Sequence, residues 1–179
     1  MVNAEEIIHR HCAGNNALEQ LLLRHSRDVA RKALQVADLH PELHLDWQFL
    51  EEAALLHDIG IVKVDAPGIH CHGTEAYIRH GLLGAEILHQ EGLPRHARVA
   101  GRHTGTGITR QAIESQGLPL PPDDYVPETP EEQVVCYADK FFSKSHPEHE
   151  KTLDEAMRSL WKFGPECTAV MERWNEMFG

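Results

Sequence analysis

The chain has 179 residues, 41% of them hydrophobic and 25% charged, which is ordinary for one globular domain with a packed core. Its formal net charge of -11 argues against binding long nucleic acid, because that affinity comes mainly from Lys and Arg neutralising phosphates. No apolar run could cross a membrane, residues 1–10 lack the apolar core of a signal peptide, and the four cysteines form no CxxC pair, so we expect a cytoplasmic protein with reduced thiols.

The first helices are expected over residues 4–12 and 16–39. Apolar residues of the long helix recur at helical spacing and form one stripe, made of Leu18, Leu22, Val29, Ala33 and Val36. His25 is in phase with that stripe, so its imidazole is expected to face the core. A single histidine on an apolar face is more often a satisfied core residue than a ligand, so other inward-facing polar residues must decide its role.

Asp46 is a good N-cap for the next helix, which runs into the segment Ala-Leu-Leu-His-Asp-Ile-Gly at residues 54–60. His57 lies on the apolar face of this helix and Asp58 follows it. A buried carboxylate is costly unless it is paired or binds a metal. Gly60 is expected to stop the helix, since glycine adopts the left-handed conformation that a helix C-terminus often needs.

Two more helices are expected over residues 74–90 and 94–103, after an irregular segment at residues 61–73. His80 and His103 are in phase with the apolar residues of these helices, so both are expected to face inward. The other histidines of the region are assigned to the surface (His89 and His96) or to a mobile loop near the site, with gating or substrate binding as the alternative (His70 and His72).

Thr129 begins another strong helix, with a proline at the first helical position and Glu132 closing a capping box. Asp139 lies on the apolar face of this helix, so a second carboxylate is expected inside the fold and in need of a partner. Two final helices are expected over residues 152–163 and 165–178. No strand shows a clear alternation, so the predicted fold class is all-α.

Six inward-facing polar residues therefore come from five separate helices: His25, His57, Asp58, His80, His103 and Asp139. Four imidazoles and two carboxylates are enough to ligate two metal ions. The order His, His-Asp, Asp resembles the HD-domain superfamily of metal-dependent phosphohydrolases. The resemblance covers roughly residues 18–145 and rests on Arg24-His25-Ser26, His57-Asp58-Ile59-Gly60 and Tyr137-Ala138-Asp139-Lys140.

The resemblance implies a single HD domain over residues 1–179, with a helical core at about 18–145 and a C-terminal helical extension at 146–179. It also implies a first metal held by His25, His57, Asp58 and Asp139. Asp58 would bridge to a second ion held by His80 and His103, as in the dinuclear branch that includes diadenosine tetraphosphate hydrolases. The expected cofactor is a divalent metal, two ions of iron or manganese, while zinc, nickel or magnesium also suit these ligands.

The implied activity is hydrolysis of a nucleotide or other small phosphoester by a metal-activated water. Asp58, Lys63 and Arg102 are assigned to catalysis, although relatives often carry Lys directly after the His-Asp motif, where this chain has Ile61. No membrane and no long nucleic acid are expected as partners, and the oligomeric state stays open. The same six ligands also resemble those of HD-type mixed-valent di-iron oxygenases, and a ligand-sensing HD domain is a third alternative.

Overall fold

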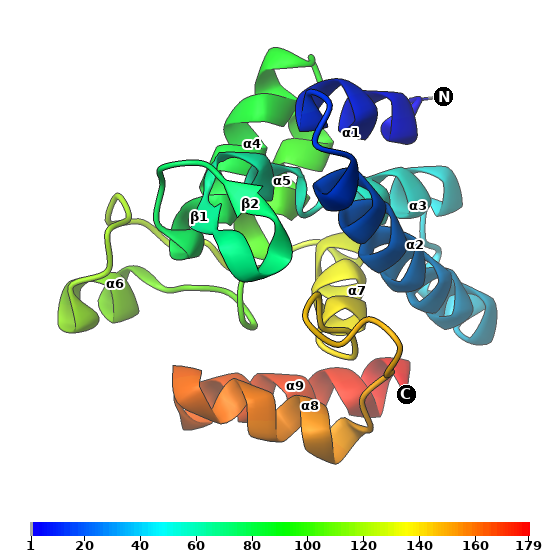
Figure 1. Ribbon diagram of the computed structural model, residues 1–179. Coiled ribbons are helices and arrows are strands. Elements are labelled where there is room, and N and C mark those ends of the chain that lie inside the picture. Colours follow the sequence, from blue (N-terminus) through cyan, green and yellow to red (C-terminus); the bar gives the residue numbers. More distant parts are fainter. Residues whose placement is uncertain (1) are drawn as a thin grey trace.

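The computed structural model describes residues 2–179, and most of them are helical (Figure 1). The expected all-α class is confirmed, because the strands β1 (Asp65–Ala66) and β2 (Cys71–His72) form only one small antiparallel pair. None of the helices described is long and apolar enough to cross a membrane. The helices are α1 Ala4–Cys12, α2 Asn16–Leu39, α3 Trp47–Leu56, α4 His80–Gln90, α5 Pro94–Arg102, α6 Arg110–Gln116, α7 Pro130–Asp139, α8 Leu153–Leu160 and α9 Pro165–Phe178.

Helix α2 links the two main parts of the hydrophobic core. Its N-cap is Asn15, whose side chain accepts a hydrogen bond from the Leu18 amide. Leu22 packs with α1, α4 and α5, whereas Val29 packs with α3, α7 and the C-terminal helices. His25 lies between these two apolar contacts, so its imidazole is held where the two parts of the core meet.

The end of α3 differs from the prediction. Gly60 does not stop the helix in a left-handed conformation, because residues 59–63 continue as a 3-10 helix after the C-cap His57. Its function in the fold is instead to permit close packing. A Cβ at Gly60 would lie 1.9 Å from the His80 carbonyl oxygen and 2.4 Å from the Gly84 nitrogen. The missing side chain thus lets α4 rest directly on the segment that follows α3.

The helix expected over residues 74–90 is shorter than predicted, since α4 begins only at His80 after one 3-10 turn. Residues 64–75 form the small hairpin of β1 and β2 instead. The reason lies in the backbone, because the Lys63 carbonyl accepts the N–H groups of Thr74 and its neighbour, both at 3.1 Å. Those bonds hold the chain extended where a helix would otherwise start.

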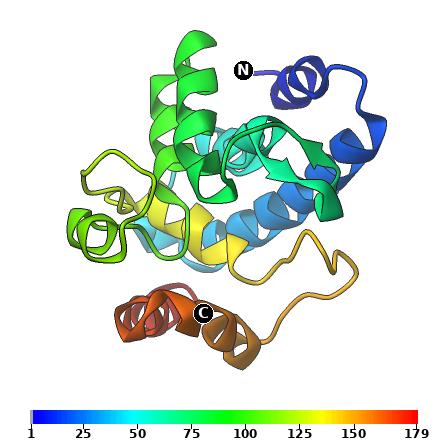
Figure 2. The ribbon, with the colours of Figure 1, turned by 60° about the vertical axis from the view of Figure 1, so that its left-hand side comes forward.

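Two predicted helix starts are confirmed. Thr129 and Glu132 form a reciprocal capping box at the start of α7, and Thr152 and Glu155 form another at the start of α8. Helices α8 and α9 lie side by side as a separate layer next to α7 in both ribbon views (Figures 1 and 2). The C-terminal extension therefore packs on the helix that ends at Asp139.

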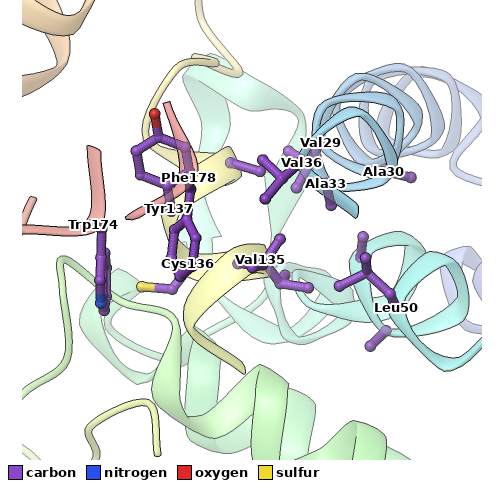
Figure 3. Close-up of a cluster of buried hydrophobic side chains, with 14 of the residues drawn as sticks. Val29, Ala30, Ala33, Val36, Leu50, Val135, Cys136, Tyr137, Trp174 and Phe178 are labelled. Atoms are coloured by element: carbon purple, nitrogen blue, oxygen red, sulfur yellow. The ribbon is translucent and has the colours of Figure 1, made fainter. Parts of the chain in front are cut away.

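The contact between α9 and α7 is part of the main hydrophobic core. Figure 3 shows Trp174 and Phe178 of α9 beside Cys136 and Tyr137 of α7. The Tyr137 ring centroid lies 5.5 Å from that of Phe178, and the Tyr137 hydroxyl donates a hydrogen bond of 2.9 Å to Asn175 Oδ1. Burying a large apolar side chain contributes about 1.5–3 kcal/mol, so α9 fixes α7 firmly.

Candidate metal centre

Six polar side chains converge where five helices meet, and all but Asp139 are buried. Their ligand atoms form two groups, each with its atoms within 4.8 Å of one another, and one carboxylate belongs to both. The first group is His25, His57, Asp58 and Asp139, and the second is Asp58, His80 and His103. The structure thus brings together every residue that the sequence singled out as a metal ligand.

The first group has the spacing of a metal site. His25 Nε2 lies 3.0 Å from both Asp58 Oδ2 and Asp139 Oδ1, and His57 Nε2 lies 3.2 and 3.4 Å from the same two atoms. Donor atoms bound at about 2.1 Å to one ion, with about 90 to 109° between the bonds, lie about 3.0 to 3.4 Å apart. His57 Nε2 is also buried without a hydrogen bond. A divalent ion therefore fits these four residues.

The second group fits an ion for a different reason. His80 and His103 each donate from Nδ1 to a backbone carbonyl at 2.7 Å, so in the neutral rings only a lone pair remains on Nε2. These two Nε2 atoms lie 3.0 Å apart, and they are 3.4 and 3.2 Å from Asp58 Oδ1. Three electron-rich atoms facing one another repel unless a cation lies among them. A second ion satisfies all three.

Three of the histidines reach the site from the end of a helical turn. His57, His80 and His103 are the C-caps of α3, of the 3-10 turn before α4, and of α5. Each donates its Nδ1 proton to the carbonyl three residues earlier, those of Ala54, Tyr77 and Ala100. Such bonds fix the tautomer and the ring orientation of a metal-ligating histidine.

Electrostatics also favour a cation at this place. Burial raises the pKa of Asp58, but the charges of Lys144 and His57 outweigh it and hold that pKa well below its usual range. Burial likewise raises the pKa of Asp139, and Lys140 and its histidine neighbours hold it well below the usual range. Burial, with the neighbouring His103, lowers the pKa of His80 to about 3. Two carboxylates are thus ionised and His80 is neutral, as metal ligands must be. Burial lowers the pKa of His57, but Asp58 and Asp139 outweigh it and raise that pKa to about 9, so an ion bound here displaces the His57 proton.

Two lysines complete the charge balance around the carboxylates. Lys144 Nζ lies 2.6 Å from Asp58 Oδ2 and donates a hydrogen bond of 3.2 Å to the Tyr77 hydroxyl. Lys140 Nζ lies 2.7 Å from Asp139 Oδ2 and 2.9 Å from a backbone carbonyl at the end of α5. Sequence reasoning missed Lys144, because it lies in the loop after α7, where no helical periodicity indicates its direction.

A cleft of about 350 Å³ opens beside the six residues. His80, His103 and Asp139 line it. Four lysines line the cleft, together with Tyr77, Phe142 and Phe163: Lys140, Lys144, Lys151 and Lys162. Among the described residues Lys151 and Lys162 have no ion-pair partner, so their charges remain available to an anion.

The HD domain family matches residues 22–143, a range that contains all six converging residues. The chain belongs to the HD domain family. It is 40% identical over 126 residues to the tRNA (cytidine(56)-2'-O)-methyltransferase of Picrophilus torridus and 37% identical over 123 residues to that of Thermoplasma volcanium. These matches cover 70% and 68% of this HD-domain chain but 32% of each relative, so the chain spans about a third of their length.

An uncharacterised protein of Methanocaldococcus jannaschii matches along most of both sequences. It is 34% identical over 158 residues, which cover 82% of this HD-domain protein and 85% of the relative. No solved structure matches the chain. The family assignment and the two groups of ligand atoms together are compatible with binding of divalent metal.

Two of the residues assigned to catalysis lie away from the cleft. Lys63 is exposed, and neither it nor Arg102 lines the cleft. Arg102 donates a hydrogen bond of 2.9 Å to the Val126 carbonyl and pairs with Glu128 at 3.0 Å. Successive helical residues point about 100° apart, so the residue beside an inward-facing His103 points elsewhere. Asp58, the third assigned residue, lies at the centre of the cluster.

The remaining histidines separate into exposed and buried ones. His89 is exposed as expected, and the two loop histidines, His70 and His72, are exposed and do not line the cleft. The surface assignment of His96 is wrong, since it is 7% exposed. Its Nε2 lies 3.2 Å from Glu52 Oε2, and burial lowers its pKa. Because this carboxylate is 44 residues away in sequence, local periodicity could not reveal the pair.

Proposed function

We propose that this HD-domain protein is a metal-dependent phosphohydrolase or phosphodiesterase that acts on a small phosphoester, with nucleotides as the leading class. The observation that carries the proposal is the combination of two ligand groups sharing Asp58 with a cleft lined by four lysines. The ligand groups suit two divalent ions, and the lysines suit an anionic substrate. A di-iron oxygenase would use the same ligands, and with an anionic substrate the same lysines, so dependence of turnover on O₂ is what separates it from a hydrolase.

Each part of the site then has a defined task. Divalent ions held by the two groups would supply a water of lowered pKa and polarise the phosphoryl group. Lys151 and Lys162 bind the phosphoryl oxygens, since their charges are not used by other described residues. Lys140 stays fixed by Asp139 and by a backbone carbonyl, and it keeps this carboxylate ionised and oriented.

The names of two relatives raise methyl transfer as another activity. This chain spans only about a third of those relatives, and its own described residues carry the His and Asp cluster in the range that the HD domain family matches. The net charge of -11 also disfavours binding of tRNA. We therefore assign the methyltransferase activity to those proteins alone.

The test is hydrolysis by protein loaded with manganese or iron, measured by phosphate release and by chromatography of the products, across nucleotides, dinucleoside polyphosphates and simple phosphoesters. Hydrolysis that requires metal and stops in EDTA supports the proposal. Asp58→Asn should abolish it, whereas the matched variant Asp65→Asn, at an exposed position, should retain it. Oxygen uptake and methyl transfer to tRNA are measured in parallel. Turnover that depends on O₂, without phosphate release, would establish the oxygenase instead.

A further inference from the structure

A second and larger cavity adjoins the lysine-lined cleft. It has a volume of about 740 Å³ and shares five lining residues with the cleft: Tyr77, Thr104, Gly105, Lys162 and Phe163. Its size falls within the range of about 300–1,000 Å³ that is typical of small-molecule sites. A molecule that reaches from the cleft past Phe163 therefore enters this cavity.

The walls of the cavity are of a different chemistry from the cleft. Most are apolar or uncharged, and Lys162 and Glu166 are the only ionisable side chains among its lining residues apart from Tyr77 and Cys167. Gln111 and Gln116 form no side-chain hydrogen bond with a described residue, so their amides are free to bind a polar edge. Apolar side chains supply the remaining surface, namely Ile78, Ile108, Ala112, Leu118, Phe163 and Val170.

One wall is built by the C-terminal helices. Residues 162–170 lie beyond the part of the chain that matches the HD domain family, which ends at residue 143. Another wall is the segment from Thr104 through α6. In that segment Gly107 has a φ of 107°, and a Cβ there would lie 2.8 Å from Val126. The cavity is thus made where the C-terminal helices pack against the segment from Thr104 through α6.

We propose that this cavity binds the leaving group of the phosphoester, an uncharged, ring-bearing group of nucleoside size, while the phosphate occupies the lysine-lined cleft. The inference rests on the proposed function, because the phosphate must lie beside the His and Asp cluster. Aromatic and aliphatic walls hold the faces of a ring, and the two glutamine amides hydrogen bond to its edge. The extension therefore shapes the leaving-group site, and it also contributes Lys151 and Lys162 to the phosphate-binding cleft beside the metal ligands of the family core.

The first experiment compares two substrates that release similar alcohols, adenosine 5'-monophosphate and glycerol 3-phosphate. Gln111→Trp and Val170→Trp should each fill the cavity. Either substitution should lower kcat/KM for adenosine 5'-monophosphate, relative to kcat/KM for glycerol 3-phosphate, at least tenfold. Glu114→Trp and Glu172→Trp are the matched controls, since both positions are exposed on the same helices and neither lines the cavity. An unchanged ratio in both cavity variants would overturn the inference.

A second experiment does not depend on catalysis. Binding of the four common ribonucleosides and of 2-naphthol, none of which carries phosphate, is measured by saturation-transfer NMR on the metal-free protein. Binding of at least one probe, weakened tenfold or more by Val170→Trp and not by Glu172→Trp, supports the cavity site even if no phosphoester is hydrolysed. If phosphoesters are hydrolysed but no probe binds, the hydrolase proposal stands and the cavity inference fails.

Discussion

Gly60→Ala tests whether the close approach of α4 to the end of α3 builds the metal centre. The new methyl would lie 1.9 Å from the His80 carbonyl oxygen and 2.4 Å from the Gly84 nitrogen, where ordinary contacts are 3.4 Å or longer. Both obstacles are backbone atoms, so no side chain can rotate away. Overpacking of this kind costs about 3 kcal/mol, at the upper end of the usual range. For a domain of this size, that lowers Tm by about 6–12 °C.

The same variant should damage the second ligand group, because the start of α4 carries His80. Thermal unfolding in EDTA reports the stability, and elemental analysis of manganese-loaded protein reports the ions bound. Gly68→Ala is the matched control, since nothing lies within 4 Å of its added Cβ and its φ is not positive. If Gly60→Ala melts within about 2 °C of the wild type and keeps its metal, the role given to Gly60 is refuted.

Three further predictions concern ligands, substrate binding and pH. His103→Ala removes a ligand from the second group only, so bound metal should fall from about two ions per chain toward one, and a wild type that never exceeds one ion contradicts the two-ion proposal. Lys151→Met should raise KM for the phosphoester about tenfold, whereas Lys63→Met should leave it unchanged; equal effects of both would count against the cleft. Burial lowers the pKa of His96, so the unfolded chain binds its proton first, and the free energy of unfolding should fall as pH drops below about 6.5. Urea unfolding of wild type and His96→Asn in EDTA measures this, and an identical pH slope in both proteins would exclude the effect.

The six converging residues could be predicted from sequence because each lies on a regular helix or directly at its end. For five of them the helical phase with apolar neighbours indicates an inward direction without long-range information, whereas Asp58 is included because it follows His57 in the His-Asp motif. What the phase could not show is which backbone groups orient the rings. The carbonyls that fix His57, His80 and His103 belong to the last turns of helices, whose ends are the least predictable part of a helix.

Other parts of the site depend on contacts between distant segments. Lys144 reaches Asp58 from a loop, and His96 finds Glu52 across 44 residues, so neither direction follows from local spacing. Gly60 appears in sequence as a helix terminator, but its importance comes from the approach of α4, which only the fold reveals. The cavity behind Phe163 likewise exists only because the C-terminal helices pack against the segment from Thr104 through α6.

The histidine caps have a consequence for how the protein recognises an ion. A helix end leaves carbonyls without an intrahelical partner, and at the ends of α3 and α5 the Ala54 and Ala100 carbonyls accept from the rings of His57 and His103. The Tyr77 carbonyl accepts from both the backbone N–H and the ring of His80. The rings are therefore immobilised by the folding of the chain, before any ion arrives. Little rotational entropy remains to be lost on coordination. The distances between the ligand atoms are set by folding. The protein should therefore discriminate among divalent ions by the bond lengths and coordination geometry that each ion prefers.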